Sequence, residues 1–180
     1  MVGDPEEARR LWQKADELGS TRPLCAAIAR LELGQNDFLQ EWYQTYAHDW
    51  YPATKDGGAI HSELLDTSDL LAGVLDSTRR APALKWMREA EPYVSKGFLI
   101  THYGLLGDAD GAFRVAEPFN LVDDKRYLYQ LCNIWSPRTA VIRADPRFAA
   151  LMKRWGFVDY WQRFGAPEAC SIEGAAVRCR

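Results

Sequence analysis

The chain has 180 residues, of which 47% are hydrophobic and 26% charged, a globular composition that excludes a disordered chain. Seven Trp, eight Tyr and seven Phe indicate a well-packed core with some aromatic surface left for binding. A formal net charge of −3 argues against nucleic acid as a direct partner.

Helix signals dominate the chain. Asp4 and Pro5 supply an N-cap and a first-turn proline, and apolar residues recur three and four positions apart until Gly19. Gly34 separates two such patterns by a tight turn, which predicts antiparallel neighbours. Residues 50–58 hold a proline and two glycines and are predicted to form a loop. The predicted helices span residues 4–18, 21–34, 38–46, 62–75, 82–92, 95–106, 108–116, 123–134, 145–155 and 158–164.

Strand signals are poor, because apolar and polar residues nowhere alternate over six positions with hairpin glycines beside them. The sequence therefore predicts an all-α fold. We expect residues 1–165 to form the helical domain and residues 166–180 to form a C-terminal tail.

The segment from Ser95 to Pro118 has the pattern of a helical repeat. An aromatic at Tyr103 would fill the space between two paired helices, Gly107 would permit the turn, and small Ala112 would let the second helix approach closely. A weaker copy spans residues 21–50, in which Gly34 takes the turn position and Arg30 replaces the aromatic. A third copy is expected over residues 61–92.

This pattern resembles the tetratricopeptide repeat, with Tyr103, Gly107 and Ala112 at its consensus positions. Lys96 and Ala116 stand where the family has a tryptophan and an aromatic. The resemblance implies an α-α superhelix of antiparallel helix pairs that binds a protein or peptide in its concave groove.

A second resemblance covers about 35 residues near the C-terminus. Residues 143–148, Gly156, the Tyr160–Trp161 pair and residues 167–170 look like the segment that closes tetratricopeptide arrays in some bacterial winged-helix regulators and class III adenylate cyclases. It implies that the chain is the regulatory or scaffolding part of a bacterial signalling or transcription-regulating protein.

In that family the first helix of each pair lines the groove. An acidic peptide or a C-terminal carboxylate would suit Arg126, whose helix face opposes the apolar stripe. The predicted groove residues are Leu24, Ile28, Leu31, Thr101, Leu105, Arg126, Tyr129 and Gln130.

Aromatic residues crowd one stripe of the third predicted helix and the loop after it. They suit either a helix-packing seam in the core or exposed anchors for a partner. Exposed anchors would also suit a structural domain that self-associates as a homodimer. The aromatic anchors considered are Trp42, Tyr46, Trp50 and Trp86.

No catalytic, metal or cofactor motif is present. His48, His61 and His102 lie far apart in the sequence, and none belongs to a helical metal pair. We therefore predict a protein that is not an enzyme and uses no cofactor. A small hydrolase with a scattered His/Asp site is the remaining alternative.

The cysteines lack zinc-finger spacing. Cys25 and Cys132 lie in apolar patterns and are predicted to be small core residues, whereas Cys170 and Cys179 could close a loop in an oxidising compartment. Residues 125–163 carry a local excess of six positive charges, which is typical of a solvated face or of a site for an acidic ligand.

No apolar stretch is long enough to cross a bilayer, and the N-terminus lacks the apolar core of a signal peptide. We expect no insertion into a membrane. The cytoplasm is the favoured compartment, and the periplasm would suit a part of a membrane-anchored regulator.

Overall fold

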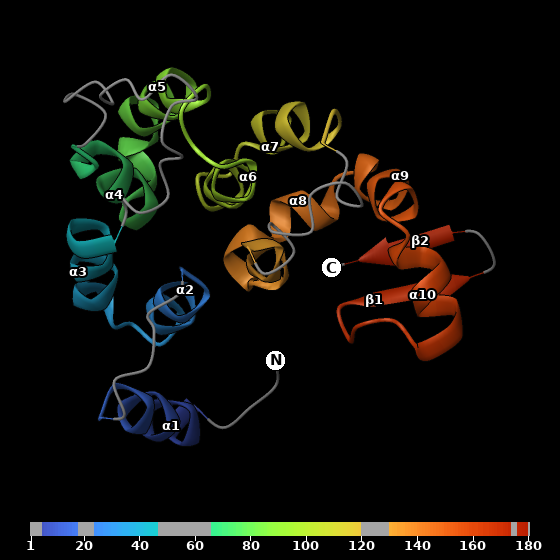
Figure 1. The fold of residues 1–180 in the computed structure, drawn as a ribbon, viewed down its shortest axis with the longest axis horizontal. Helices are drawn as coiled ribbons and strands as arrows, with labels where there is room; N and C mark the ends of the chain where they lie inside the picture. The colour runs from blue at the N-terminus through green and yellow to red at the C-terminus, as the bar shows by residue number, and fades with distance from the viewer. Residues whose placement is uncertain (1–4, 18–23, 47–65, 120–129, 174–175, 180) are drawn as a thin grey trace.

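The computed structural model describes residues 5–17, 24–46, 66–119, 130–173 and 176–179. Within them the protein is mostly helical, as the sequence predicted (Figure 1). The helices are α1 (Pro5–Glu17), α2 (Leu24–Glu32), α3 (Asn36–Tyr46), α4 (Ser68–Leu75), α5 (Arg80–Ala90), α6 (Lys96–Leu105), α7 (Ala109–Ala116), α8 (Ala140–Ala144), α9 (Arg147–Arg154) and α10 (Phe157–Phe164). Three short 3₁₀ helices, η3 (Ser77–Arg79), η5 (Gln130–Trp135) and η6 (Pro137–Thr139), and two strands, β1 (Cys170–Glu173) and β2 (Ala176–Cys179), complete the described elements.

Two helix pairs share one turn geometry. Gly34 joins α2 to α3 with φ +78°, and Gly107 joins α6 to α7 with φ +75°, a backbone region that glycine enters without strain. The residue after each glycine donates its N–H to the carbonyl of the fifth residue before it. These bonds run from Gln35 to Arg30 (2.9 Å) and from Asp108 to Tyr103 (2.8 Å).

A third pair, α4 and α5, also packs closely. A Cβ added at Gly73 of α4 would lie 2.4 Å from Cβ of Ala83 on α5, so only a glycine fits there. Within the described residues α4 begins at Ser68, later than the sequence predicted. Helix α5 begins at Arg80 and continues directly from η3.

The helices follow one another along an arc. In Figure 1 the chain runs from α2 and α3 past α4 and α5 to α6 and α7, and then turns inward to η5 and α8. Both α2 and α6 pack against η5, and α6 also packs against α8. Residues 130–144 therefore lie on the inner side of the helix pairs.

The helix predicted over residues 123–134 differs in its described part, which is the 3₁₀ helix η5. Pro137 has no N–H to continue a helical ladder, and the Ser136 hydroxyl accepts from the Arg138 N–H at 3.1 Å to start η6 instead. The buried guanidinium of Arg143 then donates to the carbonyls of Ile134 (2.5 Å) and Ser136 (2.8 Å), which a regular helix would have used.

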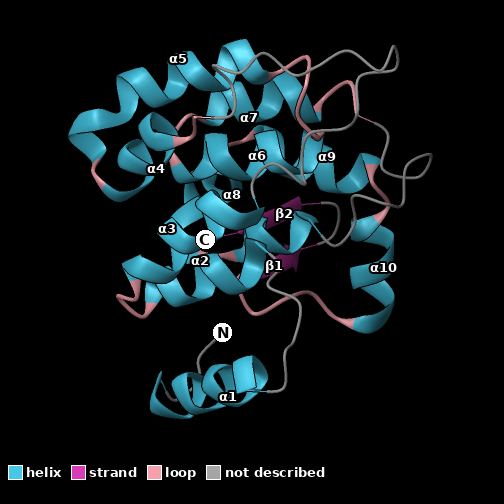
Figure 2. Cartoon of the chain, turned by 60° about the vertical axis from the view of Figure 1, so that its left-hand side comes forward, coloured by secondary structure: helices cyan, strands magenta, loops and turns pink. Residues whose placement is uncertain are grey.

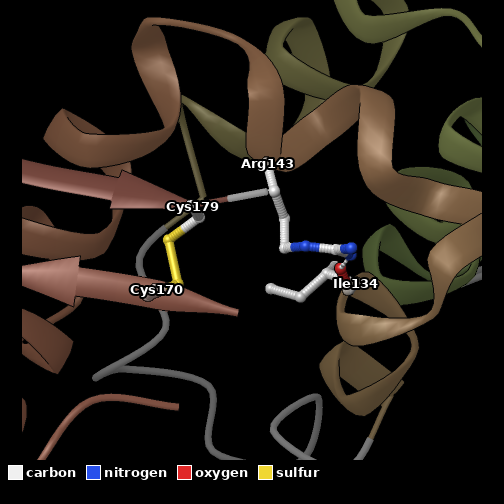
Figure 3. Close-up of a disulfide and its surroundings, with 4 residues drawn as sticks. All are labelled: Ile134, Arg143, Cys170 and Cys179. Atoms are coloured by element: carbon white, nitrogen blue, oxygen red, sulfur yellow. Dashed lines mark hydrogen bonds between the residues drawn. A yellow bond between two sulfur atoms is a disulfide. The ribbon is translucent and has the colours of Figure 1, made fainter. Parts of the chain in front are cut away.

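The tail contains a β-hairpin that the sequence did not predict. Strands β1 and β2 pair antiparallel, with Cys170 opposite Cys179 and Ile172 opposite Val177. A disulfide joins Cys170 to Cys179, so the loop considered from the sequence is closed (Figure 3). Strand β2 packs against α8 and α9, and the strands appear in magenta among the helices in Figure 2. Strands of four residues are too short to show a six-residue alternation.

Candidate functional site

The inner side of the helix pairs is not open in the structure. Of the groove residues predicted from the sequence, five have described side chains, and none exposes more than 6% of its surface. These buried residues are Leu24, Ile28 and Leu31 on α2 and Thr101 and Leu105 on α6. A side chain buried to this extent contacts other parts of the chain rather than a bound peptide.

Residues 130–144 supply much of that cover. The Ser136 hydroxyl donates to the Glu32 carboxylate at 2.5 Å, which ties the end of η5 to α2. Helix α8 lies so close to α6 that a Cβ added at Gly104 would meet Cδ1 of Ile142 at 2.5 Å. The chain thus places its own segment where the sequence predicted a ligand.

The other predicted residues divide into two groups. Trp42 (1% exposed) and Trp86 (7%) are buried, so neither ring is offered as an exposed anchor. The remaining predicted residues, or their side chains, lie outside the described part of the chain: Arg126, Tyr129, Gln130, Tyr46 and Trp50.

A cleft of about 670 Å³ opens between α3 and α4. Gln40 and Gln44 line its α3 side, and Leu71 and Leu75 line its α4 side. Arg79 of η3 borders the same cleft. Leu75 is 40% exposed and presents its side chain to the cleft. The cleft therefore combines apolar walls with amide and guanidinium groups able to bind a peptide backbone.

A second, shallower hollow of about 520 Å³ lies between α4 and α5 and shares Asp66 and Ser68 with the cleft. Trp86 lines it, and the buried indole N–H of Trp86 has no hydrogen-bond partner among the described residues. A buried donor without an acceptor is costly, but this nitrogen is enclosed and therefore does not offer its hydrogen bond to a ligand in the hollow. The two hollows flank α4 and form one continuous candidate surface, which we call the α4 surface.

One residue that lines the α4 surface, Tyr43, also makes a polar contact in the core. Tyr43 lines the cleft, and its hydroxyl lies 2.5 Å from Nε2 of His102 on α6. His102 Nδ1 lies 2.8 Å from the Phe98 carbonyl, an acceptor only, so Nδ1 carries the proton and Tyr43 donates to Nε2. Complete burial lowers the pKa of His102 to about 4, so the ring is neutral at pH 7. His102 serves packing here and does not face the cleft.

The charge around the α4 surface is mixed. Its carboxylates are those of Asp66, Asp69, Asp76 and Glu89, and its cations are those of Arg79 and Lys85. The described surface therefore favours a ligand that is not strongly acidic.

The positive stretch of residues 125–163 is partly neutralised. Arg143 is buried against backbone carbonyls, and Arg147 pairs with Asp110 and Asp145, each at 2.7 Å. Arg147 also lies over the ring of Phe113, which ties α9 to α7. These two arginines hold the fold together and are not available to an acidic ligand.

Among the described residues, no group of three or more His, Cys, Asp or Glu side chains could hold a metal ion. No helix in the same residues is long and apolar enough to cross a membrane. Comparison of the chain with models of protein families, with curated proteins and with solved structures found no match.

Sequence reasoning missed the α4 surface. Gln40 and Gln44 were available as a polar i, i+4 pair beside the aromatic stripe, but only the packing of α3 on α4 brings them opposite Leu71 and Leu75. Leu75 belongs to the apolar pattern of its helix, and that pattern does not predict that its side chain is exposed.

Proposed function

We propose that the chain is a helical-repeat module that binds a protein or peptide, and that the α4 surface is its binding site. The observation that carries the proposal is the pair of adjoining hollows, in which exposed Leu75 lies among the amides of Gln40 and Gln44 and the guanidinium of Arg79. Apolar anchors that sit among a few hydrogen-bond donors are typical of peptide recognition.

The tetratricopeptide-like and superhelical character stays part of this proposal. The shared turn geometry at Gly34 and Gly107 and the tight packing of Tyr103 against Gly111 support it. We also propose, on the sequence resemblance alone, a regulatory or scaffolding role in a bacterial signalling protein. No part of the proposal involves an enzymatic reaction.

Peptides selected from a displayed random library against the whole chain provide the test. For the tightest peptide, Leu75→Asp should raise Kd about tenfold or more, because a charge would enter the apolar wall. Leu11→Asp is the matched control, since Leu11 is an exposed leucine on α1 (53%) and should leave Kd unchanged. Equal Kd values for the two variants and the wild-type chain would remove the α4 surface from consideration.

Self-association is the second candidate function, and α10 favours it. Tyr160 (58% exposed) and Phe164 (62%) present two neighbouring rings whose centroids are 4.7 Å apart. Exposed aromatic pairs of this kind anchor interfaces. If the chain dimerises through α10, sedimentation velocity over a concentration range will show a dimer that Tyr160→Ser with Phe164→Ser converts to monomer. A wild-type chain that stays monomeric at high concentration would reject this function.

A further inference from the structure

Cys25 and Cys132 meet across the contact between α2 and η5. They are far apart in the sequence, yet their thiols lie close enough in the structure for each to shift the pKa of the other. Cys25 is half-buried and Cys132 is exposed, so the prediction that both are small core residues is wrong for Cys132. Solvent and small reagents can therefore reach at least one sulfur of the pair.

The surrounding contacts hold the two sulfurs together. Helix α2 packs against η5, and the bond from Ser136 to Glu32 joins the same two segments beyond the thiols. Sγ of Cys132 also lies 3.8 Å from Oδ1 of Asn133, its neighbour on η5. The packing of the two segments already holds the thiols close together. Little conformational entropy is therefore lost when they form a bond.

The two thiols also differ in acidity. The neighbouring Cys132 thiol lowers the pKa of Cys25 below its ordinary value, and the same proximity, together with partial burial, raises the pKa of Cys132. Cys25 is therefore the thiol of the pair that ionises more readily, and the thiolate is the form that attacks disulfides. Cys132 keeps its proton and stands beside it as the second thiol.

We infer that Cys25 and Cys132 form a reversible disulfide, made by exchange with a low-molecular-weight disulfide, which fastens η5 to α2. The Cys25 thiolate attacks one sulfur of the small disulfide, breaks its S–S bond, and releases one small thiolate. Cys132 then loses its proton to that thiolate and attacks the Cys25 sulfur, which displaces the second small thiolate. Two protein thiols are oxidised by two electrons, and one small disulfide is reduced to two thiols.

This inference does not depend on peptide binding at the α4 surface. Its consequence is structural, since the covalent link would hold residues 130–144 over α2 and α6. Together with Cys170–Cys179, it would pair all four cysteines of the chain.

The test uses the full chain with Cys170→Ser and Cys179→Ser, so that only Cys25 and Cys132 remain. After incubation with oxidised glutathione under native conditions, we expect a loss of two hydrogen masses and a proteolytic fragment in which Cys25 is joined to Cys132. Dithiothreitol should reverse both changes. The matched controls add Cys25→Ser or Cys132→Ser to the same background, and each should instead retain glutathione on the cysteine that is left.

Thermal unfolding completes the test. A bond that fits the native packing should raise Tm by roughly 5–15 °C over the reduced chain. Glutathione adducts without a joined fragment would overturn the inference. A joined fragment whose formation lowers Tm would also overturn it, because the two segments would then have to leave their native positions to bond.

Discussion

Tyr43 and His102 tie α3 to α6 inside the core. The neutral imidazole uses both nitrogens, donating to Phe98 and accepting from Tyr43, and it stacks on the Phe98 ring with centroids 3.7 Å apart. At the residue scale, therefore, a histidine that the sequence left as an isolated polar position is a satisfied part of the core. Its burial also makes two predictions about stability.

Tyr43→Phe should lower the free energy of unfolding by about 1–3 kcal/mol. The ring would still fill its space, but Nε2 of His102 would lose its donor in a site without solvent. Urea unfolding monitored by circular dichroism measures the change. Tyr160→Phe is the control, since Tyr160 is exposed and its variant should stay within about 0.5 kcal/mol of the wild-type chain.

Stability should also fall in mild acid because of His102. Its pKa is about 4 in the folded chain against an ordinary value of 6.5, so the unfolded chain binds the proton first as the pH drops. The contribution is complete above about pH 6.5 and decreases toward pH 4, by about 2–3 kcal/mol at pH 4.5. Urea unfolding at pH 7.5 and 4.5 should show a smaller loss for His102→Gln than for the wild-type chain. Equal losses would assign the acid sensitivity to other groups.

At the scale of elements, glycines set how closely helices approach. Gly73 admits α5, Gly104 admits α8, and Gly111 admits the ring of Tyr103, whose Cδ1 would lie 2.5 Å from an added Cβ. The sequence does not single out these three glycines, because only the packed structure shows which elements approach them.

Gly104→Ala should destabilise the chain by about 1–3 kcal/mol, because the new methyl group would collide with Ile142. Ile142→Ala should cost about 2–5 kcal/mol by leaving a cavity. Combined, the two changes should cost clearly less than their sum, because the methyl group would enter the space that Ile142 leaves. Urea unfolding of the four chains gives the coupling, and strict additivity would show that α8 does not rest on Gly104.

The helix pairs could be predicted because their signals are local. Gly34 and Gly107 end helices in the sequence as they do in the structure, and Asp108, the first residue of the helix predicted over 108–116, caps α7 by accepting from the Gly111 N–H at 2.8 Å. The 3₁₀ form of η5 could not be predicted in this way, and its end is held by Arg143, which lies further along the chain and donates to the carbonyls of Ile134 and Ser136. No local pattern contains that information.

At the scale of the whole molecule, the cover over the inner side of the helix pairs determines which of the predicted site residues a ligand could contact. Apolar periodicity shows that Leu24, Ile28 and Leu31 face inward, but it cannot show whether a ligand or the chain itself covers them. Residues 130–144 supply the cover in this protein. The candidate site consequently moves from the inner side to the α4 surface.

The C-terminal hairpin is joined to this arrangement through its contacts with α8 and α9. Replacing both Cys170 and Cys179 with Ser should lower stability by about 2–3 kcal/mol, because the disulfide closes a loop between residues 9 positions apart. Far-UV circular dichroism should keep its helical signal while Tm falls.

Reductant provides the control for that prediction. In a chain carrying Cys25→Ser and Cys132→Ser, adding reductant should reproduce the loss in Tm. The chain that lacks Cys170 and Cys179 as well should not respond. An unchanged Tm in the first chain would mean that the Cys170–Cys179 disulfide contributes nothing to stability.

The cover over α2 and α6 also bears on the order of events during translation. The ribosome releases residues 24–32 and 96–105 well before residues 130–144, so the apolar faces of these helices meet water or a chaperone until their cover emerges. Ribosome-bound chains halted before residue 130 should therefore be sensitive to protease and prone to aggregation. We therefore expect this protein to complete its folding only after residues 130–144 have been synthesised, and not one helix pair at a time.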